Sequence, residues 1–286
     1  MHEGLNDFIQ KCIHASYGFS LWYLPGNDSL NALIETSKQA GQIQNFDELD
    51  KATGFVFAPF VETKQHPIIV LNPDFLLRGR EKIADFTQKL PASAIPQKPK
   101  STQTSQSTVK SDYLQRCKSL IDRIKNGEAR KVVFSKIKIY KSKADLNLAE
   151  IFLKQKKNYP AAFTYLFYTP QTGLWMGASP ETLLKADNHH YHTMALAGTR
   201  AISHGKKTPK PWPEKERIEQ QWVSDFIEQK LEKLGIENYK TSETYTSAAG
   251  AIEHIRTDFI IDINNRKPLF RNLVQALHPT PAVCGF

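Results

Sequence analysis

The stretch AAFTYLFYTPQTGLWMGASPETLLKADNHHYHTMALAGTR, residues 161–200, decides the fold expected for this chain. It holds four strand-like segments, AAFTYLFYT, LWMGAS, ETLLKAD and YHTMALA, with turn signals at TPQTG and DNHH. Strands that follow one another through such short turns pair antiparallel, because parallel neighbours need a long crossover connection. The stretch therefore predicts antiparallel pairing rather than βαβ units.

The segments on either side add helices and further strands. The clearest helix is PEKERIEQQWVSDFIEQKLEKLG, where Pro213 suits the first turn and Gly235 the C-terminal stop. We expect Ile218, Trp222, Phe226 and also Leu231 to mark its buried face. Other helices are expected at 112–126, 146–158 and before the last residues, and strands at 131–140 (KVVFSKIKIY), 240–248 and 251–262. This pattern predicts an α+β fold with a large antiparallel sheet.

A change of composition divides the chain. Residues 90–111 consist largely of Pro, Ser, Thr, Gln and Lys and have no apolar period, which predicts a solvated linker or long surface loop. Residues 1–89 form an N-terminal α/β segment, with strands expected at 17–24, 54–60 and 67–71 and a helix beginning at Leu30. Residues 112–286 form the third part.

Composition and charge exclude some classes of protein. The three cysteines lie far apart, without CxxC or His pairing at zinc-finger spacing, which favours a reducing compartment. Neither a secretory leader nor a long apolar run is visible, so we expect a cytoplasmic protein without a membrane span. The net charge of +9 is compatible with nucleic acid or an anionic substrate. Because the lysines are scattered, an ordinary basic surface is the preferred interpretation.

Two short motifs contain candidate functional residues. Glu181 follows Ser-Pro in GASPETLLK, and LAGTR places Gly198 and Thr199 at the end of an expected strand. Glycine permits a close backbone approach to a ligand. Taken singly, each motif is better explained by ordinary structure: Glu181 by a turn carboxylate in water, and LAGTR by a simple β-bulge or turn.

Six stretches in order, ARKVVFSK, GASPETLL, TMALAGTR, EKERIEQQ, EHIRTDF and LHPTPAVCGF, resemble the chorismate-utilising enzymes. Among these enzymes the chain is most similar to isochorismate synthases. The resemblance covers roughly residues 112–286 and implies an αββα sandwich with large antiparallel sheets. Lys131 stands where anthranilate synthases typically have glutamine, and Ala197 stands where aminodeoxychorismate synthases carry lysine.

The resemblance implies an acid and a base. An isochorismate synthase adds water to C2 of chorismate and expels the C4 hydroxyl, and the resemblance assigns Lys131 as the base. A lysine has an ordinary pKa of about 10.4, so this base needs burial or a neighbouring cation to lose its proton. Glu181 would be the acid that protonates the departing hydroxyl, which requires a raised pKa.

The remaining site residues are also implied by the resemblance. Glu219 would bind a magnesium ion that holds the ring carboxylate of chorismate, whereas Glu214 and Glu216 are expected to be solvated. The pocket would be lined by Gly198, Thr199, His254 and Ala282. The product would feed menaquinone or siderophore biosynthesis.

The same resemblance implies a substantial C-terminal part after LHPTPAVCGF, with a second magnesium ligand and an arginine that meets the substrate. We therefore expect this chain to be C-terminally truncated and, as it stands, inactive or poorly folded. Magnesium-dependent turnover of chorismate by the 286-residue chain would contradict that expectation.

Other functions stay open at this point. A salicylate synthase shares the lysine base and the AGT turn but goes on to eliminate pyruvate. Lys131 disfavours an anthranilate synthase. A non-catalytic protein that keeps the chorismate fold, or a basic nucleic-acid-binding module, would belong to a different class. We expect the small molecule chorismate as substrate, with no nucleic acid, membrane or obligate protein partner.

Overall fold

The computed structural model describes residues 2–91, 107–142, 145–202, 211–262 and 270–284. The chain divides into two compact units, each built from two separate segments. Unit 1 comprises Met1–Thr104 and Ser142–Pro180, and unit 2 comprises Ser105–Lys141 and Glu181–Phe286. Residues 142–180, which we expected to belong with the C-terminal region, thus pack with the N-terminal segment. The strands of the stretch 161–200 are divided between the two units.

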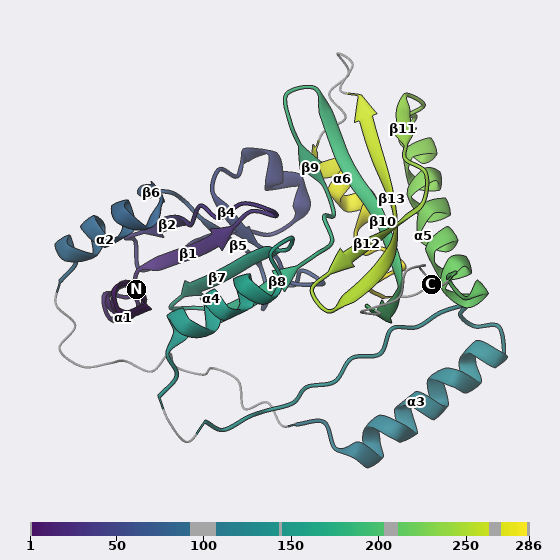
Figure 1. Ribbon diagram of the computed structural model, residues 1–286, viewed down its shortest axis with the longest axis horizontal. Helices are drawn as coiled ribbons and strands as arrows, with labels where there is room; N and C mark the ends of the chain where they lie inside the picture. The colour runs from purple at the N-terminus through teal and green to yellow at the C-terminus, as the bar shows by residue number, and fades with distance from the viewer. Residues whose placement is uncertain (1, 92–106, 143–144, 203–210, 263–269, 285–286) are drawn as a thin grey trace. The chain divides into compact units, whose positions relative to one another are not determined.

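Unit 1 contains two antiparallel sheets, visible in purple to teal in Figure 1. The larger has the order β6-β2-β1-β7-β8 and the smaller the order β3-β5-β4. The strand bounds are β1 Gly18–Tyr23, β2 Asn31–Glu35, β3 Gly41–Ile43, β4 Phe55–Phe57, β5 Ile68–Leu71, β6 Phe75–Arg78, β7 Phe163–Thr169 and β8 Gly173–Ser179. A short 3₁₀ helix spans Phe46–Lys51.

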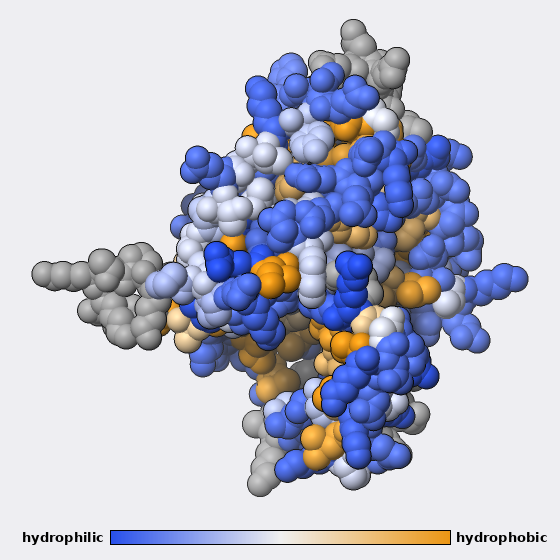
Figure 2. Space-filling view, turned by 90° about the vertical axis from the view of Figure 1, so that its right-hand side faces the viewer, coloured by the Kyte–Doolittle hydropathy of each residue, from blue (hydrophilic) through white to orange (hydrophobic). Residues whose placement is uncertain are grey.

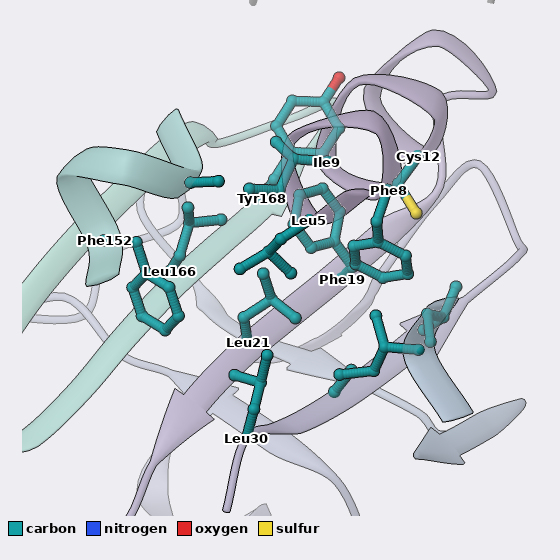
Figure 3. Close-up of a cluster of buried hydrophobic side chains, with 14 of the residues drawn as sticks. Leu5, Phe8, Ile9, Cys12, Phe19, Leu21, Leu30, Phe152, Leu166 and Tyr168 are labelled. Carbon is teal, nitrogen blue, oxygen red and sulfur yellow. The ribbon is translucent and has the colours of Figure 1, made fainter. Parts of the chain in front are cut away.

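Helices cover one face of the larger sheet in unit 1. These are α1 (His2–His14), α2 (Arg80–Lys89) and α4 (Leu148–Asn158). Figure 3 shows their apolar side chains meeting those of β1 and β7, with Phe8 and Phe19 in edge contact at 5.7 Å between ring centroids. The opposite face packs on the smaller sheet, where Phe57 stacks on Phe167 at 4.5 Å. Unit 1 therefore has its own two-sided core.

Unit 2 is built around one antiparallel sheet with the order β11-β13-β10-β9, and β12 also pairs with β13. The bounds are β9 Lys185–Ala186, β10 His190–Ala201, β11 Tyr239–Thr241, β12 Tyr245–Ala249 and β13 Ile252–Asp262. Helices α5 (Glu214–Lys233) and α6 (Phe270–Leu277) pack on this sheet, and α5 runs alongside β10 and β13 in Figure 1. Helix α3 (Lys110–Lys125) also belongs to unit 2.

The α+β class and the antiparallel pairing are confirmed, since every strand pair in both units is antiparallel. The expected helix at Leu30 is wrong. Residues 31–35 form the strand β2, which is buried along its whole length between β1 and β6. Propensity at a capping residue is a weak signal, and burial between two strands overrides it.

The segment 131–140 forms no named strand in the described structure, although its sequence alternates. It is tied down by individual hydrogen bonds, such as the 2.8 Å bond from the Thr108 amide to the Ile137 carbonyl and the 3.1 Å bond from the Val133 amide to the Cys284 carbonyl. Val133, Ile137 and Ile139 are exposed. Alternation creates a strand only where a neighbouring strand supplies a ladder of hydrogen bonds.

The buried face of α5 also differs from the expectation. Val223, Ile227 and Leu231 are fully buried, whereas Ile218 is exposed. Two polar side chains, Gln220 and Ser224, complete the buried stripe. Because these polar residues occupy core positions, the hydrophobic pattern missed part of the stripe, although Leu231 is buried as expected and Phe226 packs against the core.

Among the described residues, no helix combines the length and apolar character needed to cross a membrane. Figure 2 shows one face of the molecule on which hydrophilic side chains predominate and apolar residues form small separate patches. Such scattered apolar residues are normal on a protein surface.

Candidate functional site

The centre of the candidate site is an ion pair in unit 2. Lys131 lies in the extended segment after α3, and its Nζ is 2.7 Å from Oε1 of Glu219 on α5. The two side chains are only 15% and 27% exposed, respectively. The Lys131 ammonium has no well-directed hydrogen bond within the described residues, so the contact is ionic. The structure therefore brings together two residues that are 88 positions apart in the sequence.

Glu181 lies beside this pair, in the segment that leads into β9. Burial raises the pKa of its carboxyl from 4.5 to about 7, and the positive charge of Lys131 opposes that rise. At neutral pH the carboxyl is therefore divided between its protonated and ionised forms. A carboxyl in this state can donate a proton.

Helix α5 presents a second carboxylate next to Glu219. Glu216 is one turn earlier on the same helix, since residues three apart are neighbours on a helix surface. Its Oε2 atom is buried and has no hydrogen-bond partner within the described residues. Burying such an acceptor without a partner is costly. Two adjacent carboxylates, one of them unsatisfied, are the oxygen ligands that Mg²⁺ prefers.

Gly198 fits closely against α5. Strand β10 has a β-bulge between Ala197 and Thr199, and Gly198 adopts φ +68° there. A Cβ at this position would lie 3.0 Å from the Cβ of Glu216 and 3.2 Å from Cδ1 of Ile255. The glycine thus allows the strand to approach the helix at Glu216, whereas the sequence suggested an approach to a ligand.

The bulge also fixes His254 on β13, the cross-strand partner of Thr199. Nδ1 of His254 lies 3.1 Å from the Gly198 carbonyl and 3.1 Å from Oγ1 of Thr199. A carbonyl oxygen only accepts, so a hydrogen bond to it requires the proton on Nδ1 and leaves Nε2 as an acceptor. Thr199, Gly198 and His254 thus form one hydrogen-bonded group.

Ala282 lies in the turn after α6 and packs on the core of unit 2. Two residues after Ala282, the carbonyl of Cys284 accepts a hydrogen bond from the amide of Val133, which lies in the same segment as Lys131. The charge of Lys131 also acts on the Cys284 thiol, whose pKa is raised by burial and lowered by that charge, with a net rise. Lys131 is therefore in electrostatic reach of Glu181, Glu219 and Cys284.

Two of these residues were not identified from the sequence. Glu216 was expected to be solvated, and Cys284 was noted only as an isolated cysteine. The signal for Glu216 was its position seven residues before the buried Val223, on the rotated stripe of α5. Cys284 lies in the stretch LHPTPAVCGF, one of the six that resemble the family, but its link to Lys131 depends on a contact between distant segments.

A cavity elsewhere in unit 2 suits an anionic ligand poorly. It measures about 510 Å³ and is lined by Tyr239, Ile236, Gln229 and four carboxylates, Asp225, Glu228, Glu232 and Glu237. Like charges repel a carboxylate ligand. The Lys131 group supplies a cation, a carboxyl with a pKa of about 7 and a carboxylate pair, which is the better arrangement for acid–base chemistry on an anion.

Comparison with known proteins places the chain in context. The family model for "Chorismate binding enzyme" matches residues 68–286. Isochorismate synthase MenF of Haemophilus influenzae is 23% identical over 168 residues, which cover 57% of this chain and 39% of that protein. Isochorismate synthase EntC of Escherichia coli is 28% identical over 131 residues, which cover 43% and 33%. The match thus spans less than half the length of these curated relatives.

Solved structures show the same fold. The structure of MenF, the menaquinone-specific isochorismate synthase from Escherichia coli, matches with a TM-score of 0.70 and 17% identity, covering 94% of this chain and 70% of that one. A structure described as a 2,3-dihydroxybenzoate-specific isochorismate synthase, DhbC from Bacillus anthracis, matches with a TM-score of 0.66 and 17% identity, covering 94% and 74%. The fold expected from the sequence is confirmed.

Proposed function

Because the chain belongs to the family of chorismate-binding enzymes, we propose that it is an isochorismate synthase whose acid–base pair is Glu181 and Lys131. The single observation that carries this proposal is the grouping of Lys131, Glu181 and Glu219 in unit 2, with a 2.7 Å ion pair and a carboxyl of raised pKa. The reaction adds water to C2 of chorismate and removes the C4 hydroxyl. It needs one group to take a proton and one to give a proton.

Glu181 is suited to the acid role. A pKa of about 7 leaves a large fraction of the carboxyl protonated at neutral pH, ready to protonate the departing C4 hydroxyl. The positive charge of Lys131 opposes the effect of burial on the pKa of Glu181, so the proposed acid and base are electrostatically linked.

Lys131 would be the base that takes a proton from the attacking water. It is largely buried, and its Nζ is paired with Glu219 at 2.7 Å. A metal ion held by Glu219 would compete with Lys131 for this carboxylate.

Mg²⁺ is the cation we propose, held by Glu219 and by the buried carboxylate of Glu216. When bound, Mg²⁺ would neutralise these carboxylates and attract the ring carboxylate of chorismate. Gly198, Thr199, His254 and Ala282 would line the substrate pocket. His254 would place Nε2, the nitrogen left as acceptor, toward a hydroxyl of the ring.

The product, isochorismate, would have two possible uses. The similarity to a menaquinone-specific and to a 2,3-dihydroxybenzoate-specific enzyme supports isochorismate as the product and leaves both uses, menaquinone and catechol siderophore, as destinations.

The proposal is tested by incubating the 286-residue chain with chorismate, with and without Mg²⁺, and separating the products by chromatography. Binding is followed in parallel by calorimetry. The proposal predicts isochorismate that depends on Mg²⁺ and is lost in Lys131→Ala and Glu181→Gln. The control Lys136→Ala, an exposed lysine in the same segment, keeps the activity.

Other outcomes decide against the proposal. Salicylate with release of pyruvate would show a salicylate synthase. The proposed activity departs from the inactivity expected in the sequence analysis, so binding of chorismate without any turnover would contradict the proposal and show a non-catalytic member of the family. Absence of both binding and turnover would contradict the chorismate site itself.

A further inference from the structure

A second cluster of chemical groups lies at the turn between β9 and β10, in the sequence DNHHYH. The ligand atoms of Asp187, His190 and His192 all lie within 4.8 Å of one another. We propose that this cluster binds one divalent transition-metal ion, Zn²⁺ in preference to Mg²⁺. The site does not depend on the proposed enzymatic function.

The backbone presents the two histidines together. His190 and His192 are two apart at the start of β10, and residues two apart on a strand point to the same face. The Asp187 carboxylate is fixed by the turn, because its Oδ1 accepts hydrogen bonds of 2.8 Å from the amides of His189 and His190. Its Oδ2 faces the ring of His192, 2.8 Å from Nε2.

The spacing suits a tetrahedral metal. Zinc–nitrogen and zinc–oxygen bonds of about 2.1 Å place tetrahedral ligand atoms roughly 3.4 Å apart. Nδ1 of His190 is 3.6 Å from Oδ1 of Asp187, and Nε2 of His192 is 2.8 Å from Oδ2. The side chains are 32–45% exposed and can rotate by the fraction of an ångström required. Water would take the fourth position.

A second carboxylate supports one of the ligands from behind. Asp262, the cross-strand partner of His190 on β13, places Oδ1 3.3 Å from Nε2 of His190. The other ring nitrogen, Nδ1, faces Asp187. A histidine that binds a metal through one nitrogen commonly donates its other N–H to a carboxylate, which fixes the tautomer and strengthens the ligand. This arrangement is an observation independent of the cluster itself.

The ligand types select the metal. Imidazole nitrogen suits zinc, copper and nickel, whereas magnesium prefers oxygen ligands in octahedral geometry. The cluster is also remote from the Lys131 group. Eight residues of β10 separate His190 from Gly198, about 26 Å of extended strand. Metal binding here would link the turn at Asp187 to the start of β10, and the contact between His190 and Asp262 would connect the site to β13.

The test is calorimetric titration of the full chain with ZnCl₂ in a non-chelating buffer containing excess Mg²⁺, with Co²⁺ absorption as the second readout. We expect one equivalent of Zn²⁺ to bind, and the Co²⁺ complex to show the visible bands of a tetrahedral ion. His190→Ala and His192→Ala should each weaken binding at least ten-fold, and Asp262→Asn about ten-fold. His189→Ala is the matched control, because this exposed neighbour contributes its backbone amide and lies outside the cluster.

Two results would overturn the proposal. Absence of Zn²⁺ binding by the wild-type chain is one. The other is binding that persists in a His190→Ala/His192→Ala double variant, since the metal would then be elsewhere, for example at Glu219. Far-ultraviolet circular dichroism of each variant confirms that it has folded, so loss of binding can be assigned to the missing ligand.

Discussion

Replacing Glu181 by Gln should stabilise unit 2 in alkaline solution while removing the proposed acid. Burial raises the pKa of Glu181 to about 7, whereas the unfolded chain has the ordinary value of 4.5. Between these pH values the native state holds a proton that the unfolded state has lost. The free energy of unfolding therefore falls as pH rises through this window, and the stability that the protonated carboxyl contributes is lost above pH 7.

The size of the effect follows from the pKa difference. The difference between a pKa of 4.5 in the unfolded chain and about 7 in the folded protein corresponds to about 3 kcal/mol in the free energy of unfolding. Glutamine has nearly the same shape and never ionises. The variant Glu181→Gln should thus match the wild type near pH 4.5 and exceed its free energy of unfolding by up to about 3 kcal/mol at pH 8.

The assay is native-state hydrogen exchange of peptides from β10 and β13, which reports on unit 2 alone. The control variant Glu214→Gln removes an exposed carboxylate from the first turn of α5, so it separates the general effect of losing a carboxylate from the effect of losing the buried one. An advantage of Glu181→Gln that is the same at pH 5 and pH 8 would refute the buried, protonated state of Glu181.

Three further predictions test the surroundings of the site. Lys131→Met should raise the pKa of Glu181 above 7, because the lysine charge lowers that pKa, and carbon-13 spectra of labelled glutamate measure it. The control Lys136→Met should leave the pKa of Glu181 unchanged. An unchanged or lower value in Lys131→Met would contradict the pairing. Gly198→Ala should lower the free energy of unfolding, measured by urea denaturation, by about 2–4 kcal/mol, because alanine disfavours a left-handed φ of +68° and its Cβ would crowd Glu216. The control Gly235→Ala has the same φ in open space and should cost about 1 kcal/mol. Equal costs would show that the approach of β10 to α5 is not tight. Gln220→Ala should cost about 1–3 kcal/mol, because it removes a donor to the buried Ala195 carbonyl and one of the hydrogen-bond partners of the Thr257 hydroxyl. The exposed Gln221→Ala should cost less than about 0.5 kcal/mol, and thermal unfolding of both variants decides this.

Much of the fold could be predicted from local patterns. The alternation in residues 161–200 and the boundaries Pro213 and Gly235 correctly indicated β7, β8, β10 and α5. Local patterns could not reveal the division into two units, because that depends on which distant segments pack together. They also predicted a helix from Leu30 onward where the structure has the strand β2, since a strand buried on both sides shows no alternation.

The candidate site could be predicted in part, and for a physical reason. Lys131, Glu181 and Glu219 lie in stretches that resemble a known family. Glu216 was missed because Gln220 and Ser224 take core positions on α5 through hydrogen bonds, including the 3.2 Å bond from Gln220 to the Ala195 carbonyl. A stripe that includes polar residues is invisible to a hydrophobic period.

The most direct test of the central claim, that Lys131, Glu181 and Glu219 form one chorismate site, is a crystal structure of the chain soaked with chorismate and Mg²⁺. The account predicts a metal at Glu219 and Glu216, with the substrate ring beside Lys131 and Glu181. Substrate bound elsewhere, or Lys131 still paired with Glu219 at full occupancy of substrate and metal, would contradict it.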